Sequence, residues 1–88
     1  MTTTYHSKFK RDIQKIKDKK LKKSLLNKIQ EMKDVSNVEN ISGAKKLSGH
    51  SRAYRIRIGN YRLGFYNFDG ILQLKRFVKR DDTYKIFP

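Results

Sequence analysis

Residues 54–66 read YRIRIGNYRLGFY, a stretch that alternates apolar and basic residues on either side of Gly59-Asn60. A Gly-Asn pair between two alternating runs is a signal for a two-residue β-hairpin turn. The stretch therefore predicts an antiparallel hairpin at the centre of the fold. The predicted cross-strand pairs are Ile58 with Tyr61, Arg57 with Arg62, Ile56 with Leu63, Arg55 with Gly64 and Tyr54 with Phe65.

The two faces of this hairpin differ in chemistry, because side chains on a strand alternate between faces. The apolar face is predicted to be core and carries Tyr54, Ile56, Ile58, Tyr61, Leu63 and Phe65. The second face carries Arg55, Arg57, Arg62, Gly64 and Tyr66. Arg57 lies opposite Arg62, and like charges across a ladder are destabilising. No acid occurs in the stretch, so we interpret this face as an anion site; the alternative is the solvated side of a half-buried sheet.

The charge of the chain points to a polyanionic partner. Its 88 residues include 22 basic and 8 acidic ones, a net charge of +14, and nucleic acid is the simplest partner for such a surplus. The length predicts a single domain over residues 1–88. The chain has no cysteine, which fits a reducing cytoplasm. Neither a membrane-spanning run nor an apolar signal core is present, so we expect a cytoplasmic protein with no membrane partner.

Arginine and lysine are segregated along the chain. Twelve of the fifteen lysines lie at or before Lys46. Six of the seven arginines lie in the second half, namely Arg52, Arg55, Arg57, Arg62, Arg76 and Arg80. Arginine's rigid fork suits bidentate phosphate recognition, whereas lysine acts as a point charge. We interpret the sheet as the recognising part and the helices as the source of a general positive field.

The N-terminal half predicts an edge strand over residues 2–6 and a helical hairpin. Ser7 is expected to cap a helix that runs to about Lys17, and Asp18 to cap a second helix over residues 19–33. Apolar residues at helical spacing form one buried stripe on each helix. The stripes are Phe9, Ile13 and Ile16 in the first helix, and Leu21, Leu25, Ile29 and Met32, with Leu26 beside them, in the second.

The remaining segments predict turns and a third long strand. One helical turn is expected near residues 38–41, and a strand begins at 45–47. Asp69-Gly70 is a second hairpin turn, which leads into a strand over 71–78. The resulting register pairs Phe65 with Leu74 and Tyr61 with Val78, and it places Arg76 opposite Leu63 on the apolar face. Either Arg76 lies at an open margin of the sheet or a bulge shifts the register.

A metal-dependent site is disfavoured, and no cofactor is expected. Of the eight acids only Asp81 and Asp82 are close in sequence, and adjacent residues do not converge on a hard metal ion. RNA supplies its own nucleophile in the 2′-hydroxyl, so a nuclease without metal needs cations, a proton acceptor and a proton donor. Tyr84 could stack on a base. Histidine is the residue type best suited to proton transfer near neutral pH, which makes His50 a candidate; the alternative is an ordinary loop histidine. The candidate cations are Arg55, Arg57, Arg62 and Arg80.

These residues carry a resemblance to the RelE/ParE superfamily of type II toxins. The segments LSGHSRAYRIRIGNYRLGFY and LKRFVKRDDTY resemble its C-terminal two-thirds. The most specific marks are Leu47-x-Gly49, the YRIRIGNYR block and Arg80-x-x-x-Tyr84. The resemblance implies an α+β fold in which an N-terminal helical hairpin packs on a small antiparallel sheet. It also implies an antitoxin as protein partner.

The resemblance assigns a role to each matching residue. Arg55 and Arg57 take the two basic positions before the hairpin turn, and Arg62 matches a phosphate-binding arginine. Arg80 matches an arginine proposed as acid or charge stabiliser, and Tyr84 a stacking tyrosine. Some members have lysine where this chain has Arg55 and Arg57. Because arginine cannot lose its proton, the proton acceptor stays open between ribosomal RNA groups, His50 and Tyr84.

The full matched set, four arginines together with Tyr84, favours the RelE branch, which cleaves mRNA in the ribosomal A site, over the ParE branch, which poisons DNA gyrase. We therefore predict a metal-independent endoribonuclease that leaves a 2′,3′-cyclic phosphate and a 5′-hydroxyl, with ribosome, mRNA and an antitoxin as partners. The alternatives are a ParE-like gyrase inhibitor and an RNA-binding module without activity. Further RNA contacts are assigned to Arg52, Lys75, Arg76 and Lys79.

Overall fold

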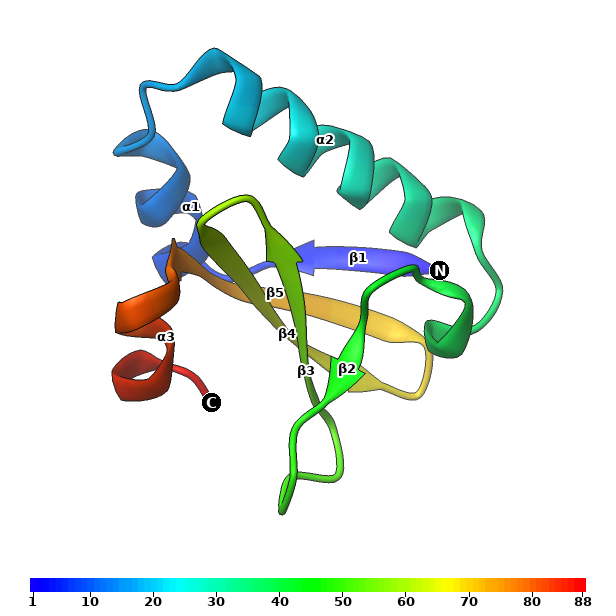
Figure 1. Ribbon diagram of the computed structural model, residues 1–88. Helices are drawn as coiled ribbons and strands as arrows, with labels where there is room; N and C mark the ends of the chain where they lie inside the picture. The colour runs from blue at the N-terminus through cyan, green and yellow to red at the C-terminus, as the bar shows by residue number, and fades with distance from the viewer.

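The structure is a computed structural model that describes residues 1–88, with the side chain of Tyr84 excepted. A five-stranded sheet has the order β1-β5-β4-β3-β2, and it lies between α2 on one face and α3 on the other (Figure 1). The elements are β1 (Thr2–Tyr5), α1 (Ser7–Gln14), α2 (Lys19–Asp34), the 3-10 turn η1 (Val38–Asn40), β2 (Lys45–Lys46), β3 (Ala53–Ile58), β4 (Tyr61–Phe68), β5 (Ile71–Lys79) and α3 (Arg80–Ile86). The predicted α+β class is confirmed; β1 pairs with β5 in parallel, whereas the other strand pairs are antiparallel as predicted.

The central hairpin has the predicted register throughout. All five predicted pairs, from Ile58 with Tyr61 out to Tyr54 with Phe65, are present between β3 and β4. Gly59 has a φ of 58°, which the first position of a type II′ turn requires. In the next turn both Asp69 and Gly70 have positive φ, as in a type I′ turn. Two local turn signals therefore align three consecutive antiparallel strands.

The register between β4 and β5 is only partly as predicted. Phe65 pairs with Leu74 as expected, but Tyr61 pairs with Lys79 instead of Val78. A shift at Gly64/Phe65 leaves Lys75 without a partner on β4, so Arg76 lies opposite Gly64 rather than Leu63. The predicted pairs of Tyr61 and Arg76 are therefore wrong, and the bulge alternative is confirmed. The extra residue moves the charge off the apolar face and places an apolar side chain, Phe77, opposite Leu63.

One hydrophobic core fills the space between the helices and the sheet. Stacked rings extend it across the strands, with Tyr54 and Phe65 at 5.5 Å and Tyr61 and Phe77 at 5.1 Å between centroids. Leu26, expected beside the stripe of the second helix, is 65% exposed. The buried members are Phe9, Ile16, Leu25, Ile29, Met32, Val38, Ile41, Ile56, Ile58, Leu63, Phe65, Leu72, Leu74 and Phe77.

The helix caps differ in how well the sequence predicts them. Asp18 caps α2, because its carboxylate accepts hydrogen bonds from the backbone N–H groups of Lys20 and Leu21 at 2.9 and 3.2 Å. The predicted cap at Ser7 is wrong: His6 is the N-cap, and its Nδ1 accepts from the Lys8 N–H at 3.1 Å. The helix also ends at Gln14 rather than Lys17, since the chain must turn there to reach α2.

The C-terminal helix α3 lies on the sheet face opposite α1 and α2, and no sequence pattern predicts it. The residue after it, Phe87, is 4% exposed and packs over Gly64, where an added Cβ would lie 2.5 Å from Phe87 Cδ2. Because glycine has no side chain, position 64 leaves room for the Phe87 ring. In the part of the chain that the structure describes, no helix is long and apolar enough to cross a bilayer.

Candidate functional site

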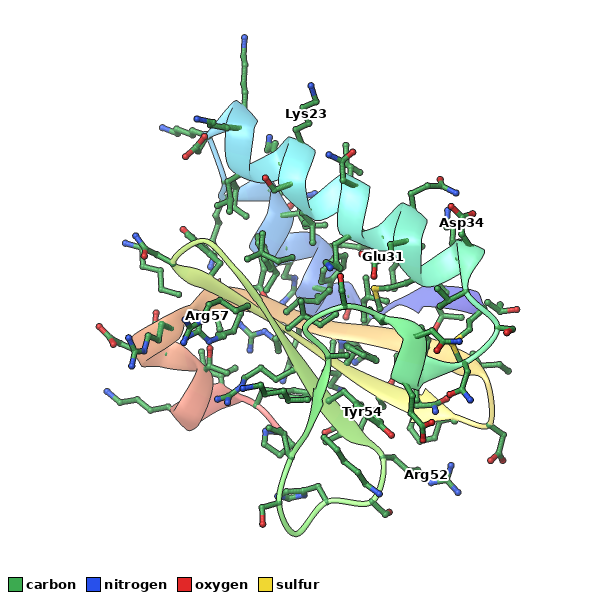
Figure 2. All side chains as sticks on the ribbon, turned by 45° about the vertical axis from the view of Figure 1, so that its right-hand side comes forward. Lys23, Glu31, Asp34, Arg52, Tyr54 and Arg57 are labelled. Carbon is green, nitrogen blue, oxygen red and sulfur yellow. The ribbon has the colours of Figure 1, made fainter. Side chains whose placement is uncertain are left out.

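Three strands build a cationic hollow on the sheet face that carries the hairpin arginines. We call it the arginine pocket; its volume is about 260 Å³, and it is lined by Gly43, Lys45, Arg55, Arg57 and Arg62. The register creates it, because Arg55 pairs with Lys45 on one side and Arg57 pairs with Arg62 on the other. In Figure 2 Arg57 lies on the side of the sheet away from α2, while Lys23 projects from the far side of that helix.

Among the residues that the structure describes, the lining of the arginine pocket contains four cations and no acid. Like charges at cross-strand distance repel one another, and an anion placed among them removes that cost. Guanidinium forks bind phosphate oxygens with two parallel hydrogen bonds. The geometry therefore suits a phosphodiester, which supports the anion-site interpretation over that of a plain solvated face.

Arg62 is the most buried member of the pocket. Its exposed fraction is 5%, and its guanidinium donates to the Tyr61 carbonyl at 3.3 Å. Arg62 is therefore buried, although it is not a member of the hydrophobic core. β4 lies between β3 and β5 in the sheet, and α3 packs against it, so this side chain is enclosed while Arg57 is exposed and Arg55 is half-buried. Enclosure fixes the Arg62 fork in position.

His50 lies in an exposed loop next to the pocket. A second hollow of about 230 Å³ is lined by His50 and Arg55 together with Thr83, Phe87 and other residues. Arg55 lines both hollows, so the two lie next to each other. The structure therefore brings the one candidate histidine beside the arginine pocket, a neighbourhood that only the packing of the C-terminal segment creates.

The start of α3 is tied to the central hairpin turn. The Arg80 N–H donates to the Asn60 carbonyl at 2.9 Å, and the preceding residue, Lys79, pairs with Tyr61. Arg80 therefore lies at the same end of the hairpin as Arg57 and Arg62, with its side chain exposed. The predicted stacking residue Tyr84 lies on α3, but its side chain is outside the described residues.

Two of the other predicted RNA contacts, Arg76 and Arg52, contact groups outside the pocket, whereas Lys79 lies at the pocket end of the hairpin, opposite Tyr61. The Arg76 guanidinium donates to both carboxylate oxygens of Asp12 in α1, at 2.7 and 3.0 Å. These bonds raise the pKa of Arg76 and hold its charge beside a helix. Lys75, the bulge residue, precedes it. Arg52 lies over the ring of Phe68, 5.6 Å from the centroid, and in Figure 2 it lies near the opposite end of β3 from Arg57.

Sequence reasoning missed two residues that shape this region. Lys45 lines the arginine pocket, but it belongs to a two-residue strand whose register no turn signal reveals. Asp12 is 7% exposed and accepts a hydrogen bond from the Phe77 N–H at 2.9 Å. A signal for Asp12 existed, since it follows Phe9 by three residues and thus falls on the buried stripe of its helix. Among the described residues, no group of three or more His, Cys, Asp and Glu side chains could hold a metal ion.

Comparison with known proteins gives one relative in sequence. No protein-family model matches the chain. "Toxin RelE3" of Methanocaldococcus jannaschii is 44% identical over 45 residues, which are 50% of this chain and 50% of that protein. The alignment thus spans about half the length of the relative.

Solved structures match nearly the whole chain. The RelB–RelE antitoxin–toxin complex from Methanococcus jannaschii gives a TM-score of 0.80 at 25% identity, over 96% of this chain and 98% of the matched one. The archaeal RelE–RelB complex from Pyrococcus horikoshii gives 0.73 at 18% identity, over 90% and 93% of the two chains. YafQ from E. coli gives 0.64 at 15% identity, over 93% and 96%; these last two likenesses concern the fold alone. Sequence and fold agree, and together they indicate a RelE-family type II toxin.

Proposed function

We propose that this protein is the toxin of a toxin–antitoxin pair and acts as an endoribonuclease on ribosome-bound mRNA. The arginine pocket carries the proposal: Arg57 lies directly opposite Arg62, and Arg55 and Lys45 complete a lining without any acid. Such a lining attracts a phosphodiester and stabilises the additional negative charge that develops as one of its bonds is cleaved.

The proposed reaction needs no nucleophile from the protein. The 2′-oxygen of a ribose attacks the adjacent phosphorus while the bond from phosphorus to the 5′-oxygen of the next nucleotide breaks. The 2′-hydroxyl loses its proton to an acceptor, and the leaving 5′-oxygen gains one from a donor. The products are a 2′,3′-cyclic phosphate and a 5′-hydroxyl.

The residues divide these tasks by position and chemistry. Arg62, enclosed in the sheet, supplies the fixed fork, and Arg55 and Arg57 supply further donors around the phosphate. Arg80, anchored at the hairpin turn through its backbone, stabilises the leaving group. None of these arginines can accept a proton. His50, which shares a hollow with Arg55, is the proton acceptor in this proposal, because imidazole exchanges protons near neutral pH.

The proposed partners follow from charge and from the named neighbours. One matched structure is described as an antitoxin–toxin complex and another as a RelE–RelB complex, and we infer a cognate antitoxin for this chain as well. The net charge of +14 suits an acidic antitoxin segment and, in its absence, ribosomal RNA. We further infer that the protein acts in the cytoplasm, where ribosomes and mRNA are found.

The proposal is tested with the purified protein on ribosomes programmed with a defined mRNA. We expect cuts within the translated region and fragments that end in a cyclic phosphate, as shown by end-group analysis. Arg57→Ala should lose the activity, whereas Arg11→Ala, a matched loss of an exposed arginine on α1, should keep it. A 3′-hydroxyl product would rule out attack by the 2′-oxygen. Intact mRNA together with gyrase-linked DNA breaks would place the protein in the gyrase-inhibitor class.

A further inference from the structure

The arginine face of the sheet continues into an aromatic strip that the proposed chemistry does not use. Phe87 packs over Gly64, its ring lies 5.2 Å from that of Tyr66, and Tyr66 lies 5.7 Å from Phe68. The Arg52 guanidinium lies 5.6 Å from the centroid of Phe68. We call Phe87, Tyr66, Phe68 and Arg52 the aromatic strip. It runs along β4 away from the arginine pocket, since Arg62, Gly64, Tyr66 and Phe68 alternate onto one face.

The outer end of the strip is open to solvent. Phe68 is 42% exposed, the Arg52 side chain is 49% exposed, and Tyr66 is half-buried. A large ring on a sheet surface is costly to leave in water, and here three rings and a guanidinium gather in one line. The inner end, Phe87, is buried against Gly64 and joins the strip to the pocket region.

We propose that the aromatic strip is a stacking platform for unpaired RNA bases next to the phosphodiester held in the arginine pocket. This inference rests on the proposed function for its choice of ligand. Bases of single-stranded RNA stack on aromatic rings and on arginine planes, largely regardless of sequence. Arg62 and Phe68 are six residues apart on β4, which corresponds to about 20 Å at about 3.4 Å per residue. An extended RNA strand can therefore reach from the pocket to the strip.

Charge favours RNA over an apolar protein segment as the occupant. No acid occurs from Arg52 through Phe68, and the carboxylate of Asp69, in the turn that follows, lies 3.8 Å from the Arg52 guanidinium. A surface built only for apolar contact would not need a guanidinium over its outermost ring. A guanidinium over an aromatic ring instead supplies both a stacking plane and a phosphate contact.

The test uses fluorescently labelled RNA oligonucleotides and the whole protein. Phe68→Leu keeps an apolar side chain but removes the ring, and Phe68→Tyr keeps the ring. Ile71→Ala, a change of an exposed apolar residue that pairs with Phe68, is the matched control. We expect Phe68→Leu to weaken binding of a uridine octanucleotide about 5- to 20-fold, with Phe68→Tyr and Ile71→Ala close to the unmodified protein. Binding of a dinucleotide, which fills only the arginine pocket, should not change.

The outcomes separate this inference from the proposed nuclease. If the unmodified protein fails to bind the octanucleotide, or if Phe68→Leu binds it as tightly as Phe68→Tyr does, the proposed platform is wrong, while cleavage on ribosomes can still occur. If Phe68→Leu weakens purified antitoxin binding and leaves RNA binding unchanged, the strip is a protein-docking surface. If the expected pattern is found but no mRNA is cut, the platform stands and the nuclease proposal fails. Circular dichroism of each variant checks that it is folded.

Discussion

Asp12 in α1 and Arg76 in β5 form a bidentate ion pair. Arg76 Nε lies 2.7 Å from Asp12 Oδ2, and Arg76 Nη2 lies 3.0 Å from Asp12 Oδ1. Asp12 also accepts a hydrogen bond from the Phe77 N–H. Leu74 is the last β5 residue that pairs with β1, so Phe77 lies beyond the end of that pairing. Beyond the end of β1, the Asp12 carboxylate therefore satisfies a β5 N–H group that no neighbouring strand reaches. It also neutralises the charge of Arg76, which follows the bulge.

Replacing Asp12 with Ala should therefore destabilise the protein by about 1–3 kcal/mol, because a buried N–H and a largely buried guanidinium are both deprived of their partner. Urea unfolding measures the change in the free energy of unfolding. Asp34→Asn, at an exposed acid of α2, should change it by less than about 0.5 kcal/mol. Equal effects of the two substitutions would contradict the role given to Asp12.

Gly64→Ala should displace Phe87, because the added Cβ would lie 2.5 Å from the ring. We expect a loss of about 1–3 kcal/mol, as for other overpacked sites, and faster amide exchange in α3. The control is the same substitution in a Phe87→Ala background. There the added methyl group meets no ring, so its cost should nearly vanish. A cost that persists in that background would mean that the clash with Phe87 is not the cause.

Arg62→Ala should lower cleavage on programmed ribosomes by about 10²–10³, the usual loss for a donor aimed at transition-state charge. Arg62→Lys keeps the charge but loses the fork, so it should remain well below the unmodified protein. Because Arg62 is buried, each variant needs a thermal unfolding scan beside its rate. A loss of activity explained entirely by unfolding would remove Arg62 from the site.

Arg80→Ala should lose activity with an unchanged melting temperature, since the Arg80 side chain is exposed.

Neutralising helix lysines should act on association with the ribosome rather than on chemistry. Lys19→Gln, Lys20→Gln and Lys23→Gln change exposed lysines of α2. Removing each lysine–phosphate interaction should reduce the slope of log affinity against log salt by about one unit. Arg55→Ala and Arg57→Ala should instead lower the single-turnover rate on bound ribosomes. The prediction fails if the strand arginines change only the affinity. Lys28 is unsuitable for this series, because its ammonium group donates hydrogen bonds to Glu31 and Ser42 and its replacement would also change stability.

Glu31 should make stability depend on pH in the acid range. Its carboxylate accepts hydrogen bonds from Lys28 at 2.9 Å and from the Ser42 N–H at 2.6 Å, and these lower its pKa below the ordinary value. Its stabilising contribution is therefore complete above the ordinary glutamate pKa of about 4.3 and is lost as the pH falls through the lowered value. The difference in unfolding free energy between the unmodified protein and Glu31→Gln should shrink in that window. Glu39→Gln, at an exposed acid of η1, supplies the baseline.

The central hairpin follows from local sequence, because Gly59 and the alternation of residues 54–66 act between near neighbours. The same holds for α2, whose Asp18 cap and apolar stripe are local patterns. The hairpin register also places Arg57 opposite Arg62, so the main feature of the arginine pocket is predictable from residues 54–66.

Other features depend on contacts between distant segments. Arg76, which follows the bulge residue Lys75, bonds Asp12, more than sixty residues away, and no pattern within β5 indicates that partner. Phe87 packs on Gly64 and lines one hollow together with His50 and Arg55, although neither Phe87 nor Gly64 is remarkable in sequence. Local periodicity encodes which face a side chain takes, whereas the meeting of distant segments depends on shape and hydrogen-bond pairing, which arise only when the sheet is assembled.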